Sequence, residues 1–81
     1  MKEEIISLYE AYKKYVGHYC FFKTYGQEHF RESVMEADDS KLKAILGSIL
    51  EETQKEFDEY GDMEVLIYQT EFAEMLDCLC A

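Results

Sequence analysis

Residues 5–23 read IISLYEAYKKYVGHYCFFK, and apolar or aromatic side chains recur in this stretch every three or four residues. That spacing is typical of an amphipathic helix, because residues three and four apart lie on the same side of a helix. The stretch therefore predicts a helix through residue 23, with one apolar stripe against which the rest of the chain packs. The stripe consists of Ile5, Leu8, Tyr9, Tyr12, Tyr15, Val16, Tyr19 and Phe22.

Tyrosine takes four positions of this stripe, where leucine would be the usual residue. One interpretation is that the tyrosines line the rim of a helical core with their hydroxyl groups in water. The other is a contact surface for a partner, since tyrosine is enriched at binding hot spots. Phe21 favours the second interpretation, because it projects away from the stripe. We call the candidate surface the aromatic face, and it consists of Tyr9, Tyr12, Tyr15, Tyr19 and Phe21.

Glycine and aspartate supply the expected helix ends, because the chain has no proline. Gly17 inside the first stretch indicates either a close helix approach or a local break. Gly26 is suited to the left-handed residue that ends a helix. A shorter helix is expected over residues 27–37, and Asp38, Asp39 and Ser40 are expected to begin the next one, since aspartate and serine side chains accept hydrogen bonds from free backbone N–H groups. The inward side chains of the short helix are Phe30, Val34 and Ala37.

A third helix is expected to run to about residue 60 and a fourth over residues 63–79, with Gly61 ending one and Asp62 capping the other. Residues 65–68 have strand-like composition, but the helical spacing continues over four turns and no second strand exists to pair with them. The expected buried stripe of the third helix is Leu42, Ile45, Leu46, Ile49, Leu50, Thr53, Phe57 and Tyr60. That of the fourth is Val65, Tyr68, Phe72, Met75, Leu76 and Leu79.

These elements predict an all-α fold, a compact antiparallel helical bundle of three long helices and one short helix. At 81 residues, the chain is expected to form a single helical domain, residues 1–81, with a modest core. No apolar run approaches the ~18–20 residues of a membrane span. The acidic start leads directly into a helix and is unlike a signal peptide, so the expected location is the cytoplasm.

The net charge of −10 is unevenly distributed along the chain. Residues 1–31 carry a net charge of +1, whereas residues 32–81 carry three lysines against fourteen acids, a net charge of −11. Direct binding to nucleic acid is disfavoured, because that affinity comes mainly from lysine and arginine. Membrane partners are not expected either. A protein with a basic surface is the better electrostatic match.

Seven acids gather within residues 51–64, opposed there only by Lys55. One interpretation is a solvated surface that keeps a small protein soluble. In that case Gly61 and Asp62 act as ordinary helix caps. The other is a surface whose carboxylates stand in for phosphates in a basic cleft that normally holds DNA or RNA. We call this set the acidic face, and it consists of Glu51, Glu52, Glu56, Asp58, Glu59, Asp62 and Glu64.

No metal site, cofactor site or catalytic residue is predicted. His18 and Cys20 are two residues apart and point to different sides of a helix, and Cys78 and Cys80 share this problem unless the helix frays. Three cysteines are an odd number, which favours reduced thiols over a secreted disulfide framework. No phosphate-binding loop or nucleophile motif occurs. We therefore expect that the protein is not an enzyme. A thiol or metal switch that uses Cys78 and Cys80 is a further candidate class of function, beside the two named below.

In its small size, acidity, helix content and tyrosine content, the chain resembles the small phage-encoded inhibitors that block restriction, CRISPR or transcription machinery. The resemblance covers composition and size, and it carries over no residue. The net charge of −11 over residues 32–81 and the aromatic face together predict a non-enzymatic module that binds and inhibits or regulates a basic nucleic-acid-handling protein. The alternative is a structural or adaptor protein that self-associates through the aromatic face.

Overall fold

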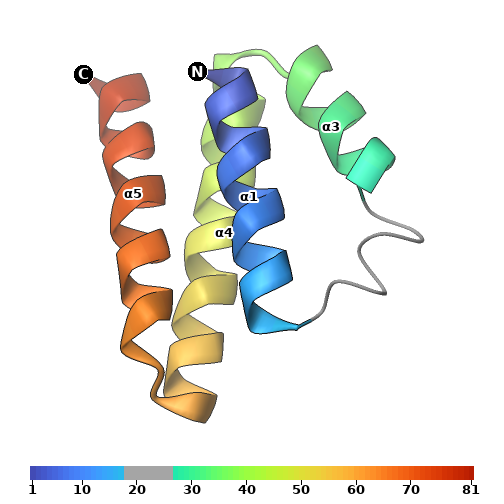
Figure 1. The fold of residues 1–81 in the computed structure, drawn as a ribbon. Helices are drawn as coiled ribbons and strands as arrows, with labels where there is room; N and C mark the ends of the chain where they lie inside the picture. Colours follow the sequence, from blue (N-terminus) through green and yellow to red (C-terminus); the bar gives the residue numbers. More distant parts are fainter. Residues whose placement is uncertain (18–26) are drawn as a thin grey trace. The chain divides into compact units, whose positions relative to one another are not determined.

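The computed structural model describes residues 1–17 and 27–81. Over these residues the chain forms helices and contains no strand. It divides into two compact units, Met1–Ala37 (unit 1) and Asp38–Ala81 (unit 2), each containing two of the described helices. Figure 1 shows the helices with the labels used below.

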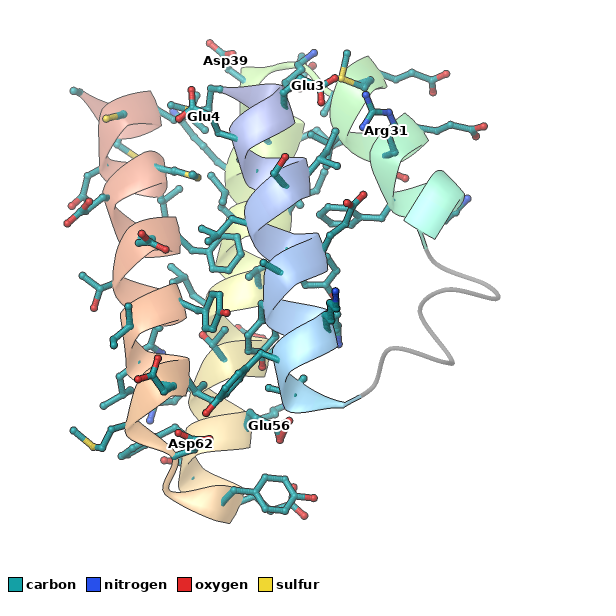
Figure 2. The ribbon with its side chains drawn as sticks, in the orientation of Figure 1. Glu3, Glu4, Arg31, Asp39, Glu56 and Asp62 are labelled. Carbon is teal, nitrogen blue, oxygen red and sulfur yellow. The ribbon has the colours of Figure 1, made fainter. Side chains whose placement is uncertain are left out.

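Unit 1 pairs helix α1 (Lys2–Val16) with helix α3 (Gln27–Glu36). The pairing is antiparallel, since the start of α1 lies beside the end of α3 (Figure 1). Lys2 Nζ donates a hydrogen bond to the backbone oxygen of Met35 at 2.8 Å. Arg31 Nη2 lies 2.6 Å from Glu3 Oε1, and Figure 2 shows these two side chains reaching across from facing helices.

Helix α1 ends earlier than the sequence predicted. It stops at Val16, and Gly17 follows with φ 84° in the left-handed region. The expectation of one continuous helix through residue 23 is therefore wrong. The physical reason is that Gly17 adopts a positive φ without the steric cost that a Cβ atom would add, so it serves as the C-cap. The other predicted end, Gly26, lies outside the described residues.

The buried side of α1 is rotated relative to the predicted stripe. Ile5, Tyr9 and Tyr12 are buried as expected, and so is Ile6, which the stripe omitted. Leu8 is half-buried and Tyr15 is exposed. In the α3 region the inward positions follow the prediction, with Val34 and Ala37 buried and Phe30 half-buried.

Unit 2 is an antiparallel hairpin of α4 (Asp39–Tyr60) and α5 (Met63–Cys80), which pack side by side (Figure 1). The Asp38 side chain caps α4 by accepting from the backbone N–H of Lys41 at 2.8 Å. Gly61 ends α4 with φ 66°, and its N–H donates to the Phe57 oxygen at 2.7 Å. Asp62 caps α5 by accepting from the N–H of Glu64 at 3.0 Å. Gly61 and Asp62 are confirmed as caps, and of the three residues predicted to start α4, Asp38 is the one whose side chain caps it.

Residues 63–80 are helical, so the helix predicted over the strand-like run is confirmed. In α5, Val65 and Phe72 are buried, while Tyr68, Met75, Leu76 and Leu79 are half-buried. In α4 the buried residues are Leu42, Leu46, Ile49 and Thr53.

Tyr60 is the exception in α4. The sequence placed it on the inward stripe, but its side chain is 67% exposed. It is the last residue of the helix, and the chain turns away at Gly61 directly after it. Position at the helix end therefore overrides the periodicity that predicted burial.

Two glutamines tie the helices of unit 2 together. Gln69 Nε2 donates to Gln54 Oε1 at 3.1 Å, and Gln54 Nε2 in turn donates to Asp58 Oδ1 at 2.9 Å. Among the residues that the structure describes, the all-α class and the composition of three longer helices and one shorter helix are confirmed. The single-domain organisation stays a prediction.

Candidate protein-interaction surfaces

The acidic face lies entirely in unit 2. Five of its seven residues belong to α4, Asp62 occupies the turn, and Glu64 lies in the first turn of α5. Figure 2 labels Glu56 and Asp62, which lie at the end of the hairpin where α4 passes into α5, while Asp39 lies at the other end of α4.

The acids of α4 occupy the side of the helix that its core residues leave free. Glu51, Asp58 and Glu59 are exposed, and Glu52 and Glu56 are half-exposed. Taking 100° per residue, the exposed three project roughly opposite the buried Leu46 and Thr53, and the half-exposed two lie at the flank. The sequence pattern alone indicated this division of α4 into a buried and an acidic side.

The unit boundary coincides with the break in charge. Residues 38–81 carry twelve acids against three lysines, a net charge of −9 out of the −10 of the whole chain. Unit 1 carries six acids and five bases, a net charge of −1. One helical hairpin therefore carries nearly all of the net negative charge.

Two members of the acidic face also hold the hairpin together. Asp62 is the N-cap of α5, and Asp58 accepts from Gln54, which is bonded to Gln69 of the other helix. These two carboxylates are thus fixed in place by the fold.

The charge of the acidic face acts on Tyr60. The negative charge of Glu59 in particular, followed by desolvation and the charge of Glu56, raises the pKa of the Tyr60 hydroxyl above its ordinary value. The rise reflects the negative potential at this end of the hairpin, since a like charge nearby disfavours the ionised form of a phenol.

The aromatic face is largely inside the molecule where the structure describes it. Tyr9 is 9% exposed and Tyr12 is 1% exposed, while Tyr15 is 44% exposed. The Tyr9 ring stacks on Phe30, and Lys13 Nζ lies 5.3 Å from the centroid of the Tyr9 ring and 5.8 Å from that of Tyr12. Tyr19 and Phe21 lie outside the described residues. For Tyr9 and Tyr12 the interpretation as core residues therefore fits best.

The candidate thiol and metal residues do not converge in the described ranges. Cys78 and Cys80 are both exposed free cysteines in the last turn of α5 and point to different sides of it. His18 and Cys20 lie outside the described residues. Among residues 1–17 and 27–81, no three His, Cys, Asp or Glu side chains are grouped as a metal ion would need. In the same ranges, the helices are too short or too polar to cross a bilayer.

Sequence reasoning missed one feature of unit 2, the exposure of three large apolar side chains. Tyr60, Met63 and Ile67 are 67%, 66% and 56% exposed. A signal existed for two of them, because Met63 and Ile67 fall off the helical stripe that contains Val65 and Phe72.

Comparisons of this chain with protein-family models, with curated proteins and with solved structures give no match.

Proposed function

We propose that this protein is a non-enzymatic binding module whose acidic face binds the basic surface of a nucleic-acid-handling protein and inhibits or regulates it. The observation that carries the proposal is the concentration of charge in unit 2, where a net charge of −9 lies on a two-helix hairpin. Such a surface raises the local concentration of a basic partner and speeds association.

The density of charge along α4 supports mimicry of a phosphate backbone. Residues 51–59 hold five acids and one lysine. At 1.5 Å of rise per residue this segment is ~12 Å long, so it carries roughly one net negative charge per ~3 Å. One strand of B-DNA carries one phosphate per ~3.4 Å of axis. The negative charge along this helix is therefore about as dense as that along one DNA strand, so a cleft that neutralises phosphates with lysine and arginine could bind it.

The exposure of the acidic side chains of α4 supports a role in binding a partner rather than a role in the fold alone. Glu51 and Glu59 are exposed, so their carboxylates are accessible to a partner. They extend along a convex helix side, which is suited to entering a cleft of another protein. We also propose a cytoplasmic location for the protein, because the free thiols of Cys78 and Cys80 would stay reduced there.

The first test uses the full chain as tagged bait in a cell lysate at ~50 mM and ~300 mM salt, with retained proteins identified by mass spectrometry. We expect a basic nucleic-acid-binding protein that is captured at low salt and lost at high salt, because salt screens exposed charges. The purified partner is then assayed for nucleic-acid binding with and without this protein. Competition with the nucleic acid supports mimicry.

Charge reversal tests the surface itself. The triple variant E52K/E56K/E59K changes the charge of α4 by +6 and should abolish capture. The matched control is E71K/E74K/D77K, which changes the charge by the same amount at three exposed positions of α5. If both variants lose capture equally, total charge decides binding and the acidic face is not the contact surface. Capture that is unaffected by the first variant contradicts the electrostatic proposal.

Self-association through the aromatic face is the competing proposal. Its exposed member among the described residues is Tyr15, because Tyr9 and Tyr12 are buried in the single chain. Light scattering at high micromolar concentration separates the two. A monomer under those conditions contradicts self-association and leaves the binding-module proposal in place.

A further inference from the structure

Tyr60 is the tyrosine of the described residues that a second protein reaches most easily. Its side chain is 67% exposed, whereas Tyr15 is 44% exposed and the other described tyrosines are buried or half-buried. Tyr60 is also the last residue of α4, and Gly61 follows it in the left-handed conformation. The last carbonyl groups of a helix lack partners within the helix, and helix ends open at a lower free energy than helix interiors. An enzyme can therefore rearrange the chain around Tyr60 at a lower cost than around a tyrosine in the middle of a helix.

Acidic residues lie on both sides of Tyr60 in the sequence. Residues 56–64 read EFDEYGDME and hold five acids and no lysine or arginine. The charges of Glu59 and Glu56 raise the pKa of the Tyr60 hydroxyl, so these two carboxylates are close to it in space as well as in sequence. An enzyme that acts on Tyr60 therefore needs a basic substrate-binding surface.

Tyr15 provides an internal contrast to Tyr60. Residues 11–19 read AYKKYVGHY and contain two lysines and no acid. A basic substrate-binding surface repels this segment and attracts residues 56–64, since opposite charges steer association and like charges oppose it. The two exposed tyrosines of the described residues thus differ in the class of enzyme that would accept them.

A phenolic hydroxyl can accept a phosphoryl group from a nucleoside triphosphate that the modifying enzyme binds with a metal ion. The bond between the γ-phosphorus and Tyr60 Oη forms while the bond from that phosphorus to the β–γ bridging oxygen breaks, and the nucleoside diphosphate leaves. The phenol is protonated at neutral pH, so a base of the modifying enzyme takes its proton.

We propose that Tyr60 is a phosphorylation site, modified by a protein tyrosine kinase whose substrate-binding surface is basic. Two observations carry this inference, the exposure of Tyr60 at the end of α4 and the acids on both sides of it. The inference goes beyond the proposed function and does not depend on it.

Phosphorylation of Tyr60 should weaken the fold locally. A phosphotyrosine carries about −1.5 to −2 charges at pH 7. It stands at the C-terminus of α4 directly after Glu59, and both the helix dipole and the neighbouring carboxylate disfavour an added anion there. We expect the phosphorylated chain to have a lower urea midpoint than the unmodified chain. The difference should shrink at high salt, because salt screens the repulsion.

The test treats the purified full chain with ATP, Mg²⁺ and a tyrosine kinase domain that prefers substrates with acidic residues beside the tyrosine. Mass spectrometry of the digested chain measures the rate of phosphorylation at each tyrosine. We expect Tyr60 to be modified at least about tenfold faster than Tyr15, since favourable charge raises association rates by ~10- to 1,000-fold. The variant Y60F should lose the fast phase of phosphorylation.

A pair of matched variants tests the role of the neighbouring acids. E56Q/E59Q should slow the modification of Tyr60 toward the rate at Tyr15. E71Q/E74Q removes two exposed acids from α5 and should leave the rate at Tyr60 unchanged. Glutamine has nearly the shape of glutamate, so both variants should keep the fold, and circular dichroism verifies this.

A rate at Tyr60 that does not exceed the rate at Tyr15 overturns the proposal, and so does equal slowing in the two double variants. The decisive sample is the chain isolated from its native cells in the presence of tyrosine phosphatase inhibitors. A group on Tyr60 that purified alkaline phosphatase removes supports phosphorylation. An unmodified Tyr60, or a group that the phosphatase leaves in place, such as a sulfate, overturns it.

Discussion

The ring of Tyr9 in α1 stacks on the ring of Phe30 in α3, with the ring centroids 4.3 Å apart and the planes tilted by 27°. The pair joins α1 and α3 across the middle of α1, while the Lys2–Met35 and Glu3–Arg31 contacts join them nearer its start. Aromatic pairs of this kind contribute about 0.5–1.5 kcal/mol beyond the burial of their area.

A double-mutant cycle should detect this stack. We expect Tyr9→Leu and Phe30→Leu to be coupled by about 0.5–1.5 kcal/mol in the free energy of unfolding, measured by urea denaturation. The control cycle pairs Tyr9→Leu with Met35→Leu, an exposed position near the end of α3. Coupling of the same size in both cycles would show that the stack contributes nothing specific.

The cap at Asp38 should be measurable on its own. Asp38→Ala removes the acceptor of the Lys41 N–H and should lower the free energy of unfolding by about 1 kcal/mol, within a range of roughly 0.5–2 kcal/mol. Asp38→Asn keeps an oxygen acceptor and should stay close to the parent protein. Thermal and chemical denaturation provide the measurement. An equal loss in both variants would mean that the charge of Asp38, and not its hydrogen bond, stabilises α4.

Gly47 inside α4 and Gly61 directly after α4 should respond to alanine in opposite directions. Gly47 lies inside the helix, and a Cβ atom there meets nothing within 4 Å, so Gly47→Ala should stabilise the protein by about 0.5–1 kcal/mol. Gly61 has φ 66°, so Gly61→Ala should destabilise it by about 1–2 kcal/mol. The urea midpoints of the two variants should lie on either side of that of the parent. A loss of stability in Gly47→Ala would contradict the open surroundings of this residue.

The Tyr60 hydroxyl should titrate above the ordinary pKa of a tyrosine. Because Glu59 raises its pKa in the folded chain, the folded state holds this proton to a higher pH than the unfolded state does. Its contribution to stability is therefore complete below the unfolded pKa and is lost as the pH rises through the folded pKa. The ring ¹³C shift of Tyr60, assigned with Tyr60→Phe, reports the titration.

Glu59→Gln should lower the Tyr60 pKa, and so should high salt, which screens the repulsion. Glu71→Gln removes the same charge from the neighbouring helix and is the control. A Tyr60 pKa that is unchanged in Glu59→Gln would show that this end of the hairpin does not have the negative potential on which the proposed function depends.

Helix ends were determined mainly by the local sequence. Asp38, Gly61 and Asp62 act through their own backbone neighbours, since a cap needs a side-chain oxygen or a positive φ and no distant residue. The local sequence also determined which side of α4 carries the acids, because the spacing of residues along a regular helix decides the side on which each one lies. Gly17 shows the limit of this reasoning. The sequence left open whether Gly17 permits a close helix approach or breaks the helix, and its φ of 84° in the structure shows that it ends α1.

Tertiary structure decided which side chains of a helix are covered. Ile6 is buried although it lies off the predicted stripe, Tyr60 is exposed although it lies on one, and Tyr9 and Tyr12 are inside. Periodicity states which residues share a side, but burial depends on where a neighbouring helix passes and where it ends. The sequence by itself thus determined the helices, their caps and the uneven charge. Only the packed helices left Tyr60, Met63 and Ile67 exposed, because exposure is a property of what lies next to a residue in space.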